Sequence, residues 1–130
     1  MNIFAIDPCP VKSAQFLDDK RVVKMVTESV QMLSSGLAAY GGKGVYKSTH
    51  AHHPCTKWVS ASLANWLWVY EHTLALADEY SKRYGKTHLA YTKLINSDMK
   101  EQAEKRMFGK KMTPFANCAS NQAFGLDFKH

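Results

Sequence analysis

A charged stripe around Glu28 is the first feature of this sequence that could do chemistry. Arg21, Lys24, Glu28 and Gln31 follow one another at spacings of three, four and three residues, which places their side chains on one face of a helix. Neighbouring positive charge keeps a carboxylate ionised, and an ionised carboxylate can stabilise a cation or accept a proton. The alternative is an exposed salt bridge, which contributes only about 0.3 to 0.5 kcal/mol on any helix. The spacing alone favours the salt bridge.

A second group of reactive side chains lies in residues 49–58, with the sequence THAHHPCTKW. Histidine is the acid–base residue of neutral pH and the commonest metal ligand. One hypothesis is therefore a metal-dependent phosphodiesterase that uses His50, His52, His53 and Cys55. The spacing of common zinc motifs such as HExxH is absent, however, so no metal is predicted. We expect His50 or His53 to bind a phosphate or to orient the Glu28 face; alternatively, His52 or His53 only satisfies buried carbonyl groups beside Pro54.

Positive charge is concentrated late in the chain. The formal net charge is +6, and residues 80–111 hold nine basic and three acidic residues, which accounts for the whole excess. Such a segment is typical of a protein that binds a polyanion, most often nucleic acid. The alternative is a solvated helix that keeps the protein in solution. The residues predicted to hold phosphates are Lys82, Arg83, Lys86, Arg106 and Lys110.

An aromatic-rich helix precedes this basic segment. Trp66 and Tyr70 fall on its apolar stripe and are predicted to pack in the core. Trp68 falls off the stripe beside Asn65 and His72. It is therefore predicted to face a cleft or a partner, where it could stack on an extruded base.

The elements that would position these residues are helical. With 130 residues, the chain is predicted to form one domain. Apolar spacings of three and four predict helices at about 18–39, 55–84 and 96–107, with a short one near 87–94, a long loop at 41–57, an arm at 1–10 and a tail at 112–130. The predicted fold is all-α, a compact domain of three to four helices with a histidine-containing loop after the first long helix.

Several classes of protein are excluded by composition. No apolar run is long enough for a membrane helix, and no secretion signal is recognised, so a cytoplasmic protein is expected. The three cysteines are widely spaced, and we expect them to be free thiols.

Residues 17–28, LDDKRVVKMVTE, resemble the first helix of the phage pyrimidine-dimer DNA glycosylases of the endonuclease V type. Glu28 falls where that family has its catalytic glutamate, and Arg21 falls where it has a histidine. The segments HPC-x-x-W at 53–58 and YGK-x-H at 84–88 are also similar to members of the family. The resemblance covers about residues 14–88 and suggests a phage source, which would make the location the host cytoplasm.

The resemblance implies an all-α enzyme without cofactor or metal that flips a nucleotide out of damaged double-stranded DNA. The N-terminal amine, here that of Met1, would attack C1′ of the damaged nucleotide and form an imine, and Glu28 would stabilise the cationic sugar and assist strand nicking. An α-amine with an ordinary pKa near 7.7 is substantially unprotonated at neutral pH. Arg21, Lys24, His50 and His53 would line the site.

The chain departs from the family pattern in three places. Asn2 stands where the family has a threonine, Thr27 and Gln31 replace two arginines that grip DNA, and the ending at 124–130 lacks the aromatic family tail. Asn2 bears on the nucleophile, which is then the amine of a retained Met1 or is missing. The replaced arginines bear on specificity for the dimer, and the different ending indicates a diverged or shortened member of the family. The alternative hypothesis is a non-catalytic phage protein that binds nucleic acid or a small nucleotide through the same cations. Its oligomeric state is not predicted.

Overall fold

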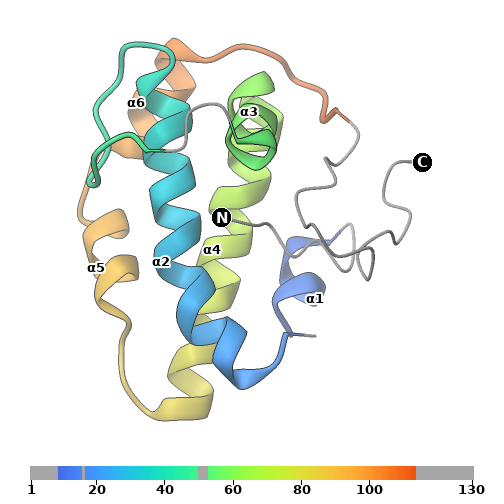
Figure 1. Ribbon diagram of the computed structural model, residues 1–130, viewed down its shortest axis with the longest axis vertical. Coiled ribbons are helices and arrows are strands. Elements are labelled where there is room, and N and C mark those ends of the chain that lie inside the picture. The colour runs from blue at the N-terminus through green and yellow to red at the C-terminus, as the bar shows by residue number, and fades with distance from the viewer. Residues whose placement is uncertain (1–8, 16, 50–52, 114–130) are drawn as a thin grey trace.

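Six helices and no strand make up the part of the chain that the computed structural model describes, residues 9–15, 17–49 and 53–113 (Figure 1). The helices are α1 (Pro10–Gln15), α2 (Asp19–Ala38), α3 (Pro54–Ala61), α4 (Leu63–Tyr84), α5 (Leu89–Ile95) and α6 (Met99–Arg106). The prediction of an all-α fold is confirmed. The predicted number of three to four helices is too low, because one predicted helix is divided and α1 was not predicted.

Helix α2 forms as its sequence predicts. The Asp18 side chain accepts a hydrogen bond from the backbone N–H of Arg21 at 2.9 Å and so caps the helix. The apolar residues that recur every three or four positions along this helix are fully buried, namely Val22, Val26, Val30, Leu33 and Leu37. Gly41, just after the helix, has a φ of +79°, a conformation that glycine adopts without steric cost.

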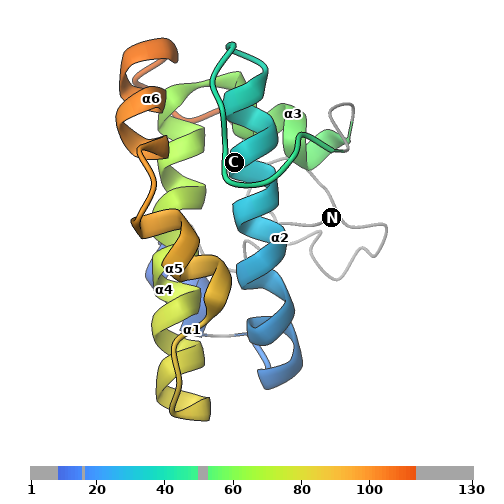
Figure 2. The ribbon, with the colours of Figure 1, turned by 90° about the vertical axis from the view of Figure 1, so that its left-hand side faces the viewer.

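The core lies between α2 and α4, which run antiparallel (Figure 1). Trp66 of α4 is fully buried, and its indole N–H donates to the Leu33 carbonyl of α2 at 3.0 Å. Trp66 stacks on Tyr70 with ring centroids 5.6 Å apart. The prediction of a core position is confirmed for Trp66, whereas Tyr70 is only partly buried and packs against the core. Helices α5 and α6 lie along one side of this pair, and α1 and α3 lie on the other (Figure 2).

The predicted helix at 55–84 is interrupted at Ser62. This residue is extended, with φ −158° and ψ 158°, and its hydroxyl caps α4 by accepting from the Asn65 N–H at 3.0 Å. Residues far along the chain satisfy the first N–H groups of α4: Leu63 donates to the Phe108 carbonyl at 2.6 Å and Ala64 to that of Gly109 at 3.0 Å. The break therefore depends on a long-range contact.

Helix α1 packs against α4 through His72. The His72 Nδ1–H donates to the Pro10 carbonyl at 2.9 Å, and the ring stacks on Trp68. The other ring nitrogen, Nε2, is buried and has no hydrogen-bond partner among the described residues. Burial lowers the pKa of His72 to about 4, because a charged imidazole loses its hydration there.

Acid is therefore expected to destabilise the fold through His72. Below the ordinary pKa of 6.5 the unfolded chain takes up a proton that the folded chain refuses until about pH 4. Stability should fall by up to about 1.4 kcal/mol per pH unit across this window, about 3 kcal/mol in total. Urea unfolding between pH 7 and 4 measures this. A His72→Gln variant should lose that part of the pH dependence, and an unchanged slope in the variant would contradict the assignment.

No helix in the described residues is long and apolar enough to cross a membrane.

Candidate active site on the second helix

Glu28 is a largely buried acid on α2. Its side chain is 18% exposed, and Oε2 lies 3.9 Å from the Nζ of Lys24, which is 78% exposed. The structure thus places Lys24 beside Glu28 as the spacing predicted. Arg21 turns instead to Asp18, with 3.6 Å between Nη1 and Oδ2. Glu28 is therefore mostly shielded from water, and the cation beside it is exposed to solvent.

The loop after α2 is fastened to the same face of that helix. The Ser35 hydroxyl donates to the Thr49 carbonyl and accepts from the Thr49 N–H, both at 2.9 Å. Ser35 follows Glu28 by seven residues, about two helical turns, so both side chains point to one side of α2. The chain therefore enters the histidine segment on the side of α2 that carries Glu28.

Gly44 allows this loop to lie flat on α2. A Cβ at Gly44 would lie 2.4 Å from the Cβ of Ser34, closer than two carbon atoms can approach. The Ser34 hydroxyl also accepts from the N–H of Tyr46 at 3.3 Å. Neither Ser34 nor Ser35 was predicted to have a role. The sequence signal that could have identified them is a pair of adjacent serines within an apolar stretch of a helix.

His53 begins α3. Its Nδ1 accepts a hydrogen bond from the Cys55 N–H at 3.1 Å, so in the neutral ring the proton lies on Nε2. This capping role is local and was not predicted. His50, predicted to line the site, and His52 lie outside the described residues, as does Met1, the predicted nucleophile.

The structure does not support Cys55 as a metal ligand. Cys55 is disulfide-bonded, so the expectation of a free thiol is wrong at this position, and the metal hypothesis loses its thiolate. Within 9–15, 17–49 and 53–113, no three histidine, cysteine, aspartate or glutamate side chains are grouped as a metal site.

Trp68 is buried, 5% exposed, so the prediction that it faces a cleft is wrong. It stacks on His72 with ring centroids 4.9 Å apart and meets Trp58 edge-on at 6.1 Å. The reason is α1: this helix covers a second face of α4, and a position beside the predicted stripe becomes core. Trp68 cannot stack on a base without unfolding this packing.

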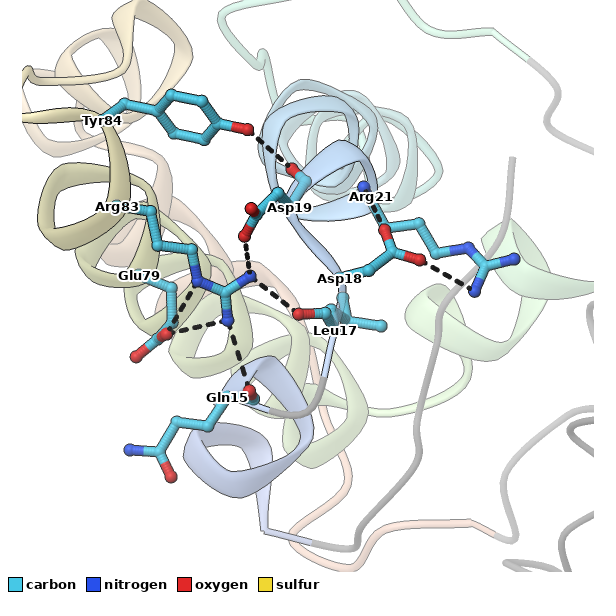
Figure 3. A network of polar contacts seen from close by, with 8 residues as sticks. All are labelled: Gln15, Leu17, Asp18, Asp19, Arg21, Glu79, Arg83 and Tyr84. Atoms are coloured by element: carbon cyan, nitrogen blue, oxygen red, sulfur yellow. Dashed lines mark hydrogen bonds and ion pairs between the residues drawn. The ribbon is translucent and has the colours of Figure 1, made fainter.

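Arg83 has a structural role in place of the predicted phosphate contact. Figure 3 shows its guanidinium reaching from α4 to the start of α2. Nε and Nη2 donate to Glu79 Oε1 at 3.2 and 2.9 Å, Nη1 donates to the Leu17 carbonyl at 2.8 Å and to Asp19 Oδ1 at 3.0 Å, and Nη2 also donates to the Gln15 carbonyl at 3.3 Å. These bonds use all five N–H groups of the side chain. None is left for a phosphate.

The other predicted phosphate-binding residues are exposed but fall into two groups. Lys82 and Lys86 lie at the end of α4, whereas Arg106 and Lys110 lie near its beginning, where the chain after α6 bonds to α4 (Figure 1). Lys82 pairs with Asp78 at 3.0 Å, and the hydrogen bond and charge of that carboxylate raise the pKa of Lys82. These four predicted phosphate-binding residues therefore lie at two separate places on the molecule.

His88, in the YGK-x-H segment, lies away from Glu28. Its Nδ1 accepts from the Ala90 N–H at 3.1 Å and caps α5, and its Nε2 lies 3.1 Å from the Val23 carbonyl. The neutral Nε2–H tautomer satisfies both contacts. His88 therefore joins α5 to α2.

Glu28 is a shielded carboxylate on an anchored helix, and exposed cations lie at both ends of the molecule. These features are those of a small all-helical protein that is suited to act on a polyanion. The family model for pyrimidine dimer DNA glycosylase matches residues 1–92, and the chain belongs to this family. The match includes Met1, Glu28 and the histidine segment. No curated protein and no solved structure matches the chain. The family resemblance is confirmed, and it supports DNA glycosylase activity and DNA as the bound substrate.

Proposed function

We propose that this protein is a DNA glycosylase with AP-lyase activity that removes damaged or modified pyrimidines from double-stranded DNA and nicks the strand. The observation that carries the proposal is the family match across residues 1–92, which spans a glutamate that the fold keeps largely shielded on α2. No cofactor or metal enters the proposed chemistry.

The proposed nucleophile is the amine of Met1. Its lone pair forms a bond to C1′, the C1′–N bond breaks, and the base leaves with that electron pair and a proton. Opening of the sugar ring gives an iminium. Loss of a proton from C2′ then expels the 3′ phosphate and nicks the strand, and water releases the amine.

Glu28 has two roles in this scheme. Its negative charge stabilises the developing cation at C1′, an effect that is stronger in a shielded site than in water. It then assists removal of the C2′ proton. Arg21, Lys24, His50 and His53 are proposed to line the site.

Borohydride trapping tests the imine. Protein is incubated with labelled duplexes that carry an abasic site, a thymine dimer or no lesion, and borohydride reduces any imine to a stable covalent bond. We expect a protein–DNA band on the lesion duplexes and, by mass spectrometry, a link at Met1. Protein acetylated at its N-terminus is the matched control and should give no band.

Absence of a band on every duplex, together with salt-sensitive binding, would overturn the proposal. That result would instead establish the alternative, in which the fold binds nucleic acid without catalysis. A link at a lysine with the acetylated protein still active would overturn only the assignment of Met1.

Salt dependence tests the phosphate contacts. Each phosphate that a lysine neutralises adds about 0.9 to the slope of log affinity against log salt. Lys86→Gln and Lys110→Gln are each expected to lower that slope by about one, whatever the DNA sequence. Fluorescence anisotropy with an undamaged duplex at several salt concentrations measures it. An unchanged slope in either variant would remove that lysine from the interface.

A further inference from the structure

The segment after α6 presents an aromatic side chain to solvent. Phe108 is 76% exposed, more than any other large hydrophobic residue described. Residues 105–111 read KRMFGKK, so four basic and no acidic residues lie within three positions of Phe108. The four basic residues are all exposed. Leu89 is the next most exposed at 66%, and Lys86 is the only lysine or arginine within three positions of it.

The backbone beneath Phe108 is fixed. The Phe108 carbonyl accepts from Leu63 at 2.6 Å and that of Gly109 accepts from Ala64 at 3.0 Å. Gly109 has φ +98°, and a Cβ there would lie 2.7 Å from the Cβ of Ser62. Met107, on the other side, is 3% exposed and anchored in the core.

The far end of the segment is fixed as well. The Asn65 side chain donates to the Thr113 hydroxyl at 2.8 Å and accepts from the Thr113 N–H at 2.9 Å. The Trp58 indole donates to the Thr113 carbonyl at 3.3 Å. Because the backbone on both sides of Phe108 is anchored, its side chain is held in an exposed position before any partner binds, which lowers the entropy cost of binding.

A partner for this surface must be apolar where Phe108 enters and anionic around it. Duplex DNA has this pattern, with stacked bases between two rows of phosphates. Proteins that kink DNA insert phenylalanine, leucine or methionine between base steps in this way and hold the flanking phosphates with basic residues. We propose that Phe108 is a wedge that enters the base stack of duplex DNA, while Lys105, Arg106, Lys110 and Lys111 bind the phosphates beside it.

The proposal rests on the proposed function for its substrate and adds a residue that opens the duplex. A base is unstacked before a glycosylase can reach it. A wedge beside the target lowers the cost of that step, because it replaces part of the stacking that is lost. An anionic lipid surface has the same charges, but the family match to a DNA glycosylase favours duplex DNA as the partner.

The test compares Phe108→Ala with Leu89→Ala, a matched loss of an exposed apolar side chain. Binding to a duplex that contains 2-aminopurine is followed by anisotropy at several salt concentrations, and 2-aminopurine fluorescence reports unstacking. Phe108→Ala is expected to lower affinity about tenfold and to remove the fluorescence rise, with the salt slope unchanged. Leu89→Ala should behave like the wild type, and Phe108→Leu should recover most of the signal.

Two results would overturn the wedge. One is a Phe108→Ala variant that binds and unstacks DNA as Leu89→Ala does; if the wild type still gives a trapped imine, the proposed function stands and only the wedge fails. The other is binding to anionic vesicles that requires Phe108 when duplex binding does not. A wild type that binds no duplex would overturn the proposed function too. Thermal melting confirms that all three variants fold.

Discussion

Glu28→Gln is expected to lower the single-turnover rate of base release by about a thousandfold, within the range for loss of a charge that stabilises a transition state. Glutamine keeps the shape of the side chain and removes its charge. DNA affinity and melting temperature should hardly change, because the Lys24 partner is 78% exposed and such a pair contributes little. The rate is measured with protein in excess over a lesion-containing duplex.

Glu71→Gln is the matched control. Glu71 is an exposed acid on α4, so its loss makes the same change in net charge without touching α2. A Glu28→Gln rate within a few fold of this control would remove Glu28 from the chemistry. It would also favour the non-catalytic alternative, provided that the variant still binds DNA.

Arg83→Gln is expected to lower the free energy of unfolding by about 3 kcal/mol, the typical cost of removing one member of a largely buried ion pair. The Arg83 and Glu79 side chains are 20% and 14% exposed. The variant leaves the Glu79 carboxylate shielded without its cation, and it leaves the carbonyls of Gln15 and Leu17 without their donor. Urea unfolding at neutral pH measures the change.

Lys82→Gln is the matched control, because it removes one positive charge at the neighbouring position of α4. Lys82 lies next to Arg83, but the side chains of Lys82 and its partner Asp78 are both 63% exposed, so its loss should hardly change the free energy of unfolding. Glu79→Gln combined with Arg83→Gln should recover part of the loss, since no shielded charge then remains. Arg83→Gln with wild-type stability and a reduced salt slope for DNA would contradict the structural role and restore the phosphate contact.

The features that depend on neighbouring residues could be predicted from sequence. Asp18 at the start of α2, the buried stripe that follows it, and Gly85 at the end of α4 with φ +69° are all set by spacing and capping. The shared face of Lys24 and Glu28 follows from the same rules. For these elements, pattern and structure agree because the forces that form them act within one or two helical turns.

The features that sequence analysis missed depend on distant contacts. The break at Ser62 interrupts a continuous apolar pattern because residues 108 and 109 satisfy the first N–H groups of α4. Trp68 is buried between Trp58 of α3 and His72, on the part of α4 against which α1, a helix of six residues, packs. Arg83 has the position of an exposed cation at a helix end, but Glu79 of α4 and the distant carbonyls of Gln15 and Leu17 accept its hydrogen bonds.

The separation of the cations bears on the length of DNA that the protein needs. Lys86 follows the end of α4, and Lys110 lies near its start, so α4 with its 22 residues holds the two groups about 33 Å apart. One turn of B-DNA is about 34 Å, or roughly ten base pairs. A duplex lying along α4 reaches both groups only if it is at least that long. Shorter duplexes would engage one end alone, and their affinity should drop sharply below about ten base pairs.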